Sequence, residues 1–391
     1  MACFSASGPL DRLRLFKSAR IIAESHSAFS TRFIPSDTIG ESYAICDLPT
    51  QFDCIEIKDT GNLNTITEAV MTTASTRMDL EGGVLGRIVV GTVDEQTSVI
   101  GIAAEHIVCD GWALGLCVRQ LGEVYCDGTH PKCSSIQDEA LQQIAWLRSR
   151  AAADAKAFWD RQLNDVGSMV PFRLPGSCQS ATVIAGETTS HSRILSLETM
   201  AHLRRIASSS RTTASALIIA AAASAARDIG ADPDLSVIAP TLNRFSISDF
   251  RRVSWAANIV TFRFKGNSPR PIELPEAAAV YNTAMQYSRY PIHQIDLDLS
   301  PAVFGQINTS SPQLYVDPSI GTVRPVLKLP GITVEPILSG SSQVLLGFVI
   351  QLVQVSGHIE VWLSHRSSYV APEIGQAMLD RVIARLYEQV S

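Results

Sequence analysis

The segment from Ala104 to Trp112, with the sequence AEHIVCDGW, contains the residues with the clearest chemical potential in this chain. It places His106 and Asp110 four positions apart, with Gly111 directly after the aspartate. The pKa of an unperturbed imidazole is about 6.5, so a histidine can take up and release a proton near neutral pH. His106 is therefore our candidate for a general base.

The elements around this segment determine how it is presented. Residues 84–90 and 98–104 have the pattern of two strands in a hairpin. Apolar residues recur at helical spacing from Leu114 to Tyr125, which predicts a buried helix. A turn that enters a helix presents backbone N–H groups, and that of Gly111 is a candidate donor to an oxyanion. Two structural roles for Gly111 are favoured over the role of oxyanion donor: backbone freedom at the turn, and the absence of a side chain that would block a channel.

The same segment resembles the active-site motif His-x-x-x-Asp-Gly of nonribosomal peptide synthetase condensation domains and of chloramphenicol-acetyltransferase-like acyltransferases. A single motif of this kind also turns up by chance, but further segments match the family in order and spacing. These segments are residues 25–33, 78–85, 158–163, 243–244 and 254–258. The resemblance covers nearly the whole chain, from about Pro9 to the last predicted helix.

The resemblance implies an α+β fold of two chloramphenicol-acetyltransferase-like αβ sandwich lobes that form a V around a central tunnel. We expect the first lobe, which carries the motif, at residues 1–165 and the second at residues 189–391. Residues 166–188 are rich in Gly, Pro and Ser, a composition typical of a linker.

The resemblance also implies a role for each site residue. His106 would lie midway along the tunnel and remove or position the proton of the nucleophile. Asp110 would point away from the tunnel and form a buried ion pair with Arg244, which is an architectural role. Asn258 would support the active site, and Trp255 is a candidate for lining the tunnel.

The reaction implied is condensation: an amide (or ester) bond forms between an acyl or aminoacyl thioester and an amine or hydroxyl nucleophile in natural-product biosynthesis. We expect a free-standing enzyme without a permanently bound cofactor. Its partners would be an acyl or peptidyl carrier protein, whose phosphopantetheine arm brings the donor, and a small-molecule amine or alcohol. The alternatives are an acyl-CoA-dependent O- or N-acyltransferase on a small molecule and a non-catalytic module that docks carrier proteins.

The sequence departs from the family pattern at three places. Glu105 replaces the first of two histidines that condensation domains usually carry, and we interpret it as a paired or solvent-reaching acid behind the strand. Ser254 replaces a glycine. The chain starts inside the usual beginning of the family, so we expect no equivalent of the family's first strand and helix.

Composition excludes several other functions. Hydrophobic residues make up 46% and charged residues 18%, as in globular enzymes. The net charge of -6 gives no positive field for nucleic acid. The apolar run 214–226 is too short to cross a membrane. The N-terminus lacks the pattern of a secretory signal, so we expect a cytoplasmic protein.

Other reactive residues have weaker signals. The eight cysteines show no C-x-x-C spacing, and we interpret them as reduced thiols. Cys109 is a poor nucleophile candidate, because residues three apart at a tight turn rarely reach transfer geometry. No histidine has metal-ligand spacing, so no metal is expected. Trp112 is expected to anchor the following helix in the core.

Periodicity and breaker residues predict the remaining elements. Helices are expected at residues 11–27, 66–78, 136–163, 197–208, 213–229, 274–288 and 371–388. Strands are expected at residues 29–34, 235–239, 259–264, 344–355 and 358–364.

Overall fold

The computed structural model describes most of the chain. The described residues are 1–36, 42–46, 49–58, 61–132, 135–163, 172–177, 187–299, 313–318, 325–337, 347–355 and 357–389. Cys133, Cys178 and most of the linker expected at residues 166–188 lie outside them.

The chain divides into two compact units, each of which combines several segments of sequence. Unit 1 contains Met1–Ala145, Arg244–Ala256 and Val323–Gly340. Unit 2 contains the rest of the chain. This division differs from the two contiguous lobes expected at residues 1–165 and 189–391.

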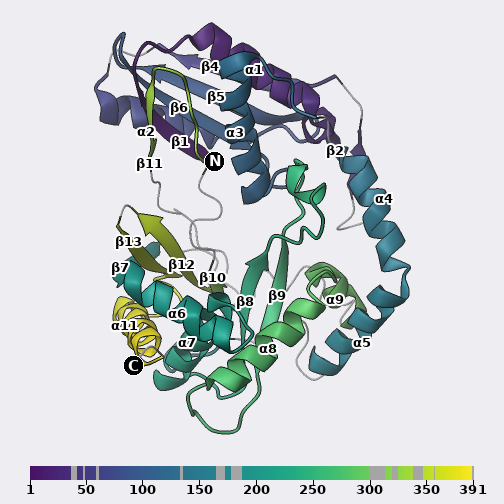
Figure 1. The fold of residues 1–391 in the computed structure, drawn as a ribbon, viewed down its shortest axis with the longest axis vertical. Helices are drawn as coiled ribbons and strands as arrows, with labels where there is room; N and C mark the ends of the chain where they lie inside the picture. Colours follow the sequence, from purple (N-terminus) through teal and green to yellow (C-terminus); the bar gives the residue numbers. More distant parts are fainter. Residues whose placement is uncertain are drawn as a thin grey trace. The chain divides into compact units, whose positions relative to one another are not determined.

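Unit 1 is built on a mixed sheet in the order β11-β1-β6-β5-β4 (Figure 1). The bounds are β1 (Ala2–Ser7), β4 (Gln51–Ile57), β5 (Val84–Thr92), β6 (Thr97–Ala104) and β11 (Thr333–Ile337). The expected hairpin is confirmed, because β5 and β6 pair in antiparallel register with Gly86 opposite Ala104. β4 pairs with β5 in parallel. Two short strands, β2 (Arg32–Pro35) and β3 (Ser42–Ile45), pair with each other outside this sheet.

Helices cover both faces of this sheet. One apolar cluster joins one face to α1 (Arg12–Ser25) and α3 (Gly111–Asp127), together with Phe29 of the 3-10 helix η1 (Ser27–Ser30). A second cluster joins the other face to α2 (Leu63–Ala74). Because successive strand residues point to opposite faces, a sheet between two helical layers is apolar on both sides, which explains why β5 is buried almost throughout.

Unit 2 has a mixed sheet in the order β7-β13-β12-β10-β8-β9. Its strands are β7 (Thr188–Ser196), β8 (Leu235–Thr241), β9 (Asn258–Phe264), β10 (Gln313–Asp317), β12 (Gly347–Val355) and β13 (His358–Arg366). Its helices include α5 (Arg150–Leu163), α6 (Leu197–Ser209), α7 (Ala214–Asp228), α8 (Leu274–Gln286), α9 (Ile292–Leu299) and α11 (Pro372–Glu388). The alanine-rich α7 is buried all round in the core of this unit.

The α+β class and most of the predicted elements are confirmed. The helix expected at residues 136–163 is two helices, α4 (Ile136–Leu147) and α5, separated at Arg148 and Ser149. Within the segment expected to be a linker, Phe172 and Leu174 are buried in the core of unit 2. The arrangement of two lobes around a tunnel stays a prediction.

Several strands were not predicted. No strand was predicted before the first helix, yet β1 lies there and pairs with both β6 and β11. Its sequence ACFSAS is buried on both faces and shows no alternation. β7 escaped detection for another reason: it is an edge strand, and only one of its residues is fully buried. Among the described residues, no helix is both long and apolar enough to cross a membrane.

Candidate active site

The segment with His106 connects the end of β6 to the start of α3 within unit 1. Asp110 is the N-cap of α3, and its Oδ1 accepts a hydrogen bond of 2.9 Å from the N–H of Ala113. Such a cap satisfies one of the N–H groups that a helix start leaves without a partner. The other end of α3 is closed by Gly128 in the left-handed conformation, with φ of 75°. The cap at Asp110 fixes where the helix begins relative to His106.

His106 is exposed, and one of its two ring nitrogens has a defined role. Its Nδ1 lies 3.2 Å from the carbonyl oxygen of Cys109. A carbonyl oxygen only accepts hydrogen bonds, so this contact requires the proton on Nδ1. The neutral ring then carries its lone pair on Nε2. The turn therefore selects the tautomer in which Nε2 can accept a proton from another molecule.

Trp255 stacks on this imidazole. The ring centroids of His106 and Trp255 are 5.7 Å apart, and the planes differ by 24°. Trp255 is 51% exposed and also belongs to unit 1. The stack therefore places the aromatic face of Trp255 against the imidazole of His106.

The expected pair of Asp110 and Arg244 is present and deeply buried. Nη1 of Arg244 donates to Oδ2 of Asp110 at 2.7 Å, and Nη2 donates to Oδ1 at 3.1 Å. The N–H of Ala256 also donates to Oδ2, at 3.0 Å. Each oxygen of the carboxylate thus accepts two hydrogen bonds, one from the guanidinium and one from the backbone. Both carboxylate oxygens of Asp110 are thus occupied by structural contacts, which fits an architectural role.

Residues 244–256 form a segment that Asp110 and its neighbours hold in unit 1. The backbone enters this segment through Asn243, which has a positive φ of 51°, a conformation that asparagine tolerates better than most residues. The indole N–H of Trp112 donates to the carbonyl oxygen of Phe250 at 2.9 Å. Trp112 is half-buried and fastens this segment, whereas the sequence predicted a core anchor for α3.

Glu105 and Gly111 have more limited roles in the structure. A carboxylate oxygen of Glu105 accepts a hydrogen bond of 3.3 Å from the N–H of Met78, as the interpretation of a paired acid requires. Gly111 is the exposed first residue of α3, and its φ is not positive. Backbone freedom therefore does not explain this glycine, and its other two candidate roles remain.

Asn258 is the one site candidate that lies in unit 2. Its Nδ2 donates to the carbonyl oxygens of Ser288 and Tyr290 at 2.8 and 2.9 Å, and its Oδ1 accepts from the N–H of Ile292 at 3.1 Å. This buried amide ties the start of β9 to the connection between α8 and α9. These three hydrogen bonds support the backbone of unit 2.

Cys109 is not suited to be a nucleophile. A hydrogen bond with Cys117, together with burial, raises the pKa of the Cys109 thiol well above its usual range. The reactive species of a cysteine is the thiolate, so this thiol stays protonated and inert. The described residues contain no group of three or more histidine, cysteine or acidic side chains that could hold a metal ion.

Sequence reasoning did not identify the pair of His26 and Gln120. Nε2 of His26 lies 2.8 Å from Oε1 of Gln120, and both side chains are buried between α1 and α3. Burial lowers the pKa of His26, and the hydrogen bond to Gln120 opposes that effect. A polar residue on the buried side of α3, at Gln120, is the one signal that could have predicted this contact.

Known proteins resemble this chain in sequence and in fold. A family model, described as the condensation domain, matches residues 1–300. A component of the linear gramicidin synthase of Brevibacillus parabrevis is 24% identical over 266 residues, which covers 66% of this chain. This chain spans only 3% of the length of that relative.

Solved structures support the same fold. The condensation domain of the Monacolin K polyketide synthase MokA has a TM-score of 0.80 and 16% identity, with 100% of this chain and 92% of that chain covered. The X-domain from teicoplanin biosynthesis has a TM-score of 0.78 and 16% identity, with 100% and 89% covered. At this identity the likeness shows the fold alone. Because the family model matches more than half of the residues, this chain belongs to the condensation-domain family.

Proposed function

We propose that this chain is a condensing acyltransferase. It joins an acyl or aminoacyl group, held as a thioester on the phosphopantetheine arm of a carrier protein, to an amine or hydroxyl nucleophile. The observation that carries the proposal is the tautomer of His106, whose Nδ1 donates to the carbonyl of Cys109 and leaves Nε2 as a proton acceptor. A general base needs this arrangement on an accessible ring.

The reaction follows from these groups. Nε2 of His106 accepts the N–H or O–H proton as the nucleophile attacks the thioester carbonyl. The carbonyl oxygen becomes an oxyanion, and the first N–H groups of α3 are the candidate donors to it. The C–S bond then breaks, and the departing thiolate takes the proton from the imidazolium. Asp110 and Arg244 hold the turn and residues 244–256, so that Trp255 stays against the imidazole.

A mass-spectrometric assay tests the proposal. Acyl-loaded carrier protein encoded near this chain is mixed with candidate amines, and the intact masses of carrier and product are followed for wild type, His106→Ala and His130→Ala. His130 is exposed and outside the site, so its variant is the matched control. We expect loss of the acyl group with appearance of the amide, slowed about 10²- to 10⁴-fold by His106→Ala and unchanged by His130→Ala.

Two other outcomes would redirect the assignment. Turnover of free acyl-CoA, with none of the loaded carrier, would identify an acyl-CoA-dependent acyltransferase that uses the same histidine. Equal rates for wild type and His106→Ala would contradict the proposal.

A non-catalytic docking role is the second candidate, and one comparison favours it. The X-domain from teicoplanin biosynthesis has also been solved in complex with OxyB, with a TM-score of 0.77 to this chain. Binding of a loaded carrier without turnover, unaffected by His106→Ala, would support docking.

A further inference from the structure

Unit 2 contains a pair of histidines that the proposed reaction does not use. His191 lies on β7 and His365 on β13, and these strands pair in antiparallel register with His191 opposite Leu363. Residues two apart on a strand point to the same face of the sheet, so both imidazoles lie on one face. The rings stack, with centroids 5.6 Å apart and planes that differ by 14°. A charge on one ring is therefore felt by the other.

Each ring has a nitrogen atom without a hydrogen-bond partner. His365 is 0% exposed, and its Nδ1 lies 3.2 Å from the carbonyl oxygen of Arg366, which requires the proton on Nδ1. Its Nε2 therefore carries a lone pair. Within the described ranges, Nε2 of His365 and Nε2 of His191 are both buried, and neither has a hydrogen-bond partner. Buried polar atoms are rarely left in this state, so two of them at one place indicate a function beyond packing.

Both nitrogens face the N-terminal part of α11, which packs against β7 and β13 (Figure 1). A Cβ atom on Gly375 would overlap Nε2 of His365 and lie 3.1 Å from Nε2 of His191. Glycine thus lets the helix backbone lie directly on the pair. The first turns of a helix present N–H groups and the positive end of the helix dipole. This part of α11 therefore offers no acceptor to a protonated Nε2.

The carboxylates on the elements around the pair are engaged elsewhere. Asp380 of α11 forms an ion pair of 2.8 Å with Arg193 of β7. Glu360 of β13 lies on the opposite face of the sheet, and Glu373 lies two positions from Gly375, on another side of the helix. β12 carries no charged residue. The other titratable residues of these strands and of the turn after β13 are His358, Arg366 and Tyr369.

We propose that this pair is an acid-sensitive contact, which holds the N-terminal half of α11, residues 372–380, on the sheet at neutral pH and releases it in acid. A proton on either Nε2 creates a buried cation that has no acceptor and that faces a second imidazole. When the helix lifts, water reaches Nε2 and the penalty disappears. The contact lies within unit 2, so the proposal does not depend on whether His106 transfers an acyl group.

The sign of the pH effect follows from burial. Burial lowers the pKa of His365, and the charge of His191 lowers it further, against the opposing effect of the hydrogen bond to Arg366. The neutral pair therefore stabilises the closed helix above the ordinary histidine pKa of about 6.5. This contribution is lost as the pH falls through the lowered value.

The C-terminal half of α11 has an anchor that mild acid leaves intact. Nε of Arg385 donates to Oδ2 of Asp228 on α7 at 2.7 Å. Arg381 lies 3.3 Å from the same carboxylate. Side chains of these two types are charged at pH 5.5. Release should therefore be confined to the N-terminal half, with the helix hinging about its contact with α7.

Hydrogen exchange along α11 tests the proposal. The exchange of amides 376–380 and 384–388 is measured at pH 7.5 and 5.5, with rates corrected for the intrinsic pH dependence of exchange. We expect acid to lower the protection of residues 376–380 by up to about tenfold for each histidine that titrates. Residues 384–388 should change little. An equal loss in both halves would mean that unit 2 opens as a whole, which would overturn the proposal.

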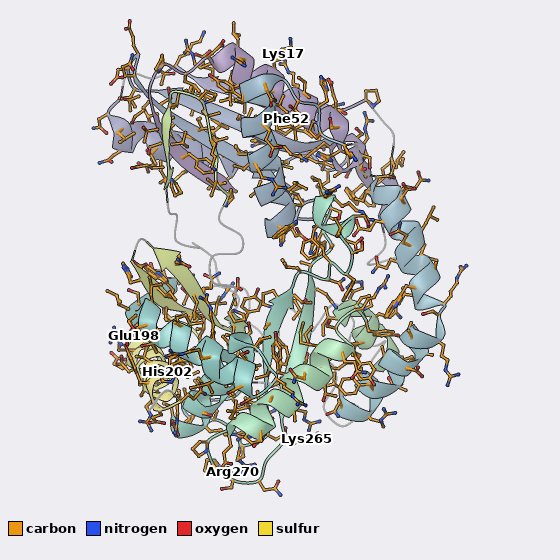
Figure 2. All side chains as sticks on the ribbon, viewed as in Figure 1. Lys17, Phe52, Glu198, His202, Lys265 and Arg270 are labelled. Carbon is orange, nitrogen blue, oxygen red and sulfur yellow. The ribbon has the colours of Figure 1, made fainter. Side chains whose placement is uncertain are left out.

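Variants of the pair separate it from other acid-sensitive groups. His365→Asn keeps a donor for the carbonyl oxygen of Arg366 but takes up no proton, and His191→Gln removes the second charge at a half-buried position. Each should reduce the acid effect on residues 376–380. His202→Gln, on α6 of the same unit (Figure 2), is the control and should leave the effect unchanged. An acid effect that neither pair variant alters would refute the proposal.

Gly375→Ala tests the contact without a proton. The added Cβ overlaps Nε2 of His365, so residues 376–380 should lose protection already at pH 7.5, although alanine favours a helix. Acid should then add little. Gln376→Ala, which places no atom against the pair, is the matched control. Wild-type protection and an unchanged acid effect in Gly375→Ala would show that α11 does not rest on the histidines.

Discussion

In unit 1, the side chains of Arg244 and Asp110 are 0% and 2% exposed, whereas in unit 2 the aspartate of the pair Asp234–Arg263 is 37% exposed. The first pair joins residues 134 positions apart and closes the turn that carries His106. The second pair joins Asp234, the residue just before β8, to Arg263 of the edge strand β9. Unit 1 thus buries a charged pair where the candidate chemistry lies, while unit 2 keeps a comparable pair in contact with water.

The largest expected effect comes from breaking the buried pair. Asp110→Ala leaves the guanidinium of Arg244 buried without its carboxylate, which should lower the free energy of unfolding by about 3–5 kcal/mol. Asp234→Ala should lower the free energy of unfolding by only about 1 kcal/mol, because that carboxylate is already partly hydrated. Urea unfolding of both variants checks the difference. Equal losses would show that burial does not separate the two pairs.

Acid should destabilise both units, through different histidines. Burial lowers the pKa of His26 in unit 1 and of His365 in unit 2. A histidine whose pKa is lower in the folded state favours folding above its unfolded pKa of about 6.5, and this contribution is lost as the pH falls through the folded value. In unit 2, the nearby charge of His191 adds to the lowering.

Hydrogen exchange at pH 7.5 and 5.5 resolves these contributions by unit. His26→Gln should reduce acid-induced opening in unit 1 alone, and His191→Gln should reduce it in unit 2 alone. A loss of protection below pH 6.5 that neither variant changes would assign the acid sensitivity to other groups.

The smallest expected effect is at the stacked tryptophan. Trp255→Ala removes the ring that stacks on the imidazole of His106. Such a contact between rings contributes about 0.5–1 kcal/mol to holding the imidazole in place, so kcat should fall about two- to fivefold. Stability should change little, because Trp255 is half exposed. Trp255→Phe retains a weaker aromatic face, so its kcat should lie between those of wild type and Trp255→Ala. A loss as large as that of His106→Ala would mean that Trp255 positions the substrate.

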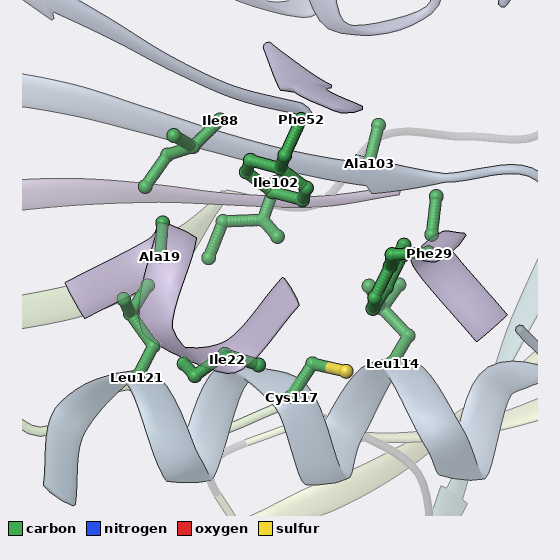
Figure 3. Close-up of a pocket in the computed structure, with 11 residues that line it drawn as sticks. Ala19, Ile22, Phe29, Phe52, Ile88, Ile102, Ala103, Leu114, Cys117 and Leu121 are labelled. Atoms are coloured by element: carbon green, nitrogen blue, oxygen red, sulfur yellow. The ribbon is translucent and has the colours of Figure 1, made fainter. Parts of the chain in front are cut away.

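The sequence was most informative where residues have local constraints. The hairpin β5–β6 follows from two apolar runs that flank a short polar turn, and the helix α3 follows from the helical spacing of its apolar residues. Contacts between distant segments were accessible only through the family resemblance, as for Asp110 and Arg244, or not at all, as for Trp112 and Phe250. β1 was missed because a short strand buried on both faces has no alternation to detect. The apolar pocket between α1, α3 and the sheet of unit 1 (Figure 3) was not predicted, because its lining comes from six separate elements.

The discontinuity of unit 1 has a consequence for its synthesis. Its central sheet needs residues 333–337 as an edge strand, and the pair of Asp110 needs Arg244. On the ribosome, the first 145 residues emerge long before either of these segments. The nascent unit must therefore wait, with the Asp110 carboxylate unpaired and one side of β1 open, until most of the chain has been translated. Incomplete domains with open strand edges are prone to association. A pause in translation before residue 244 should therefore promote aggregation of the nascent chain.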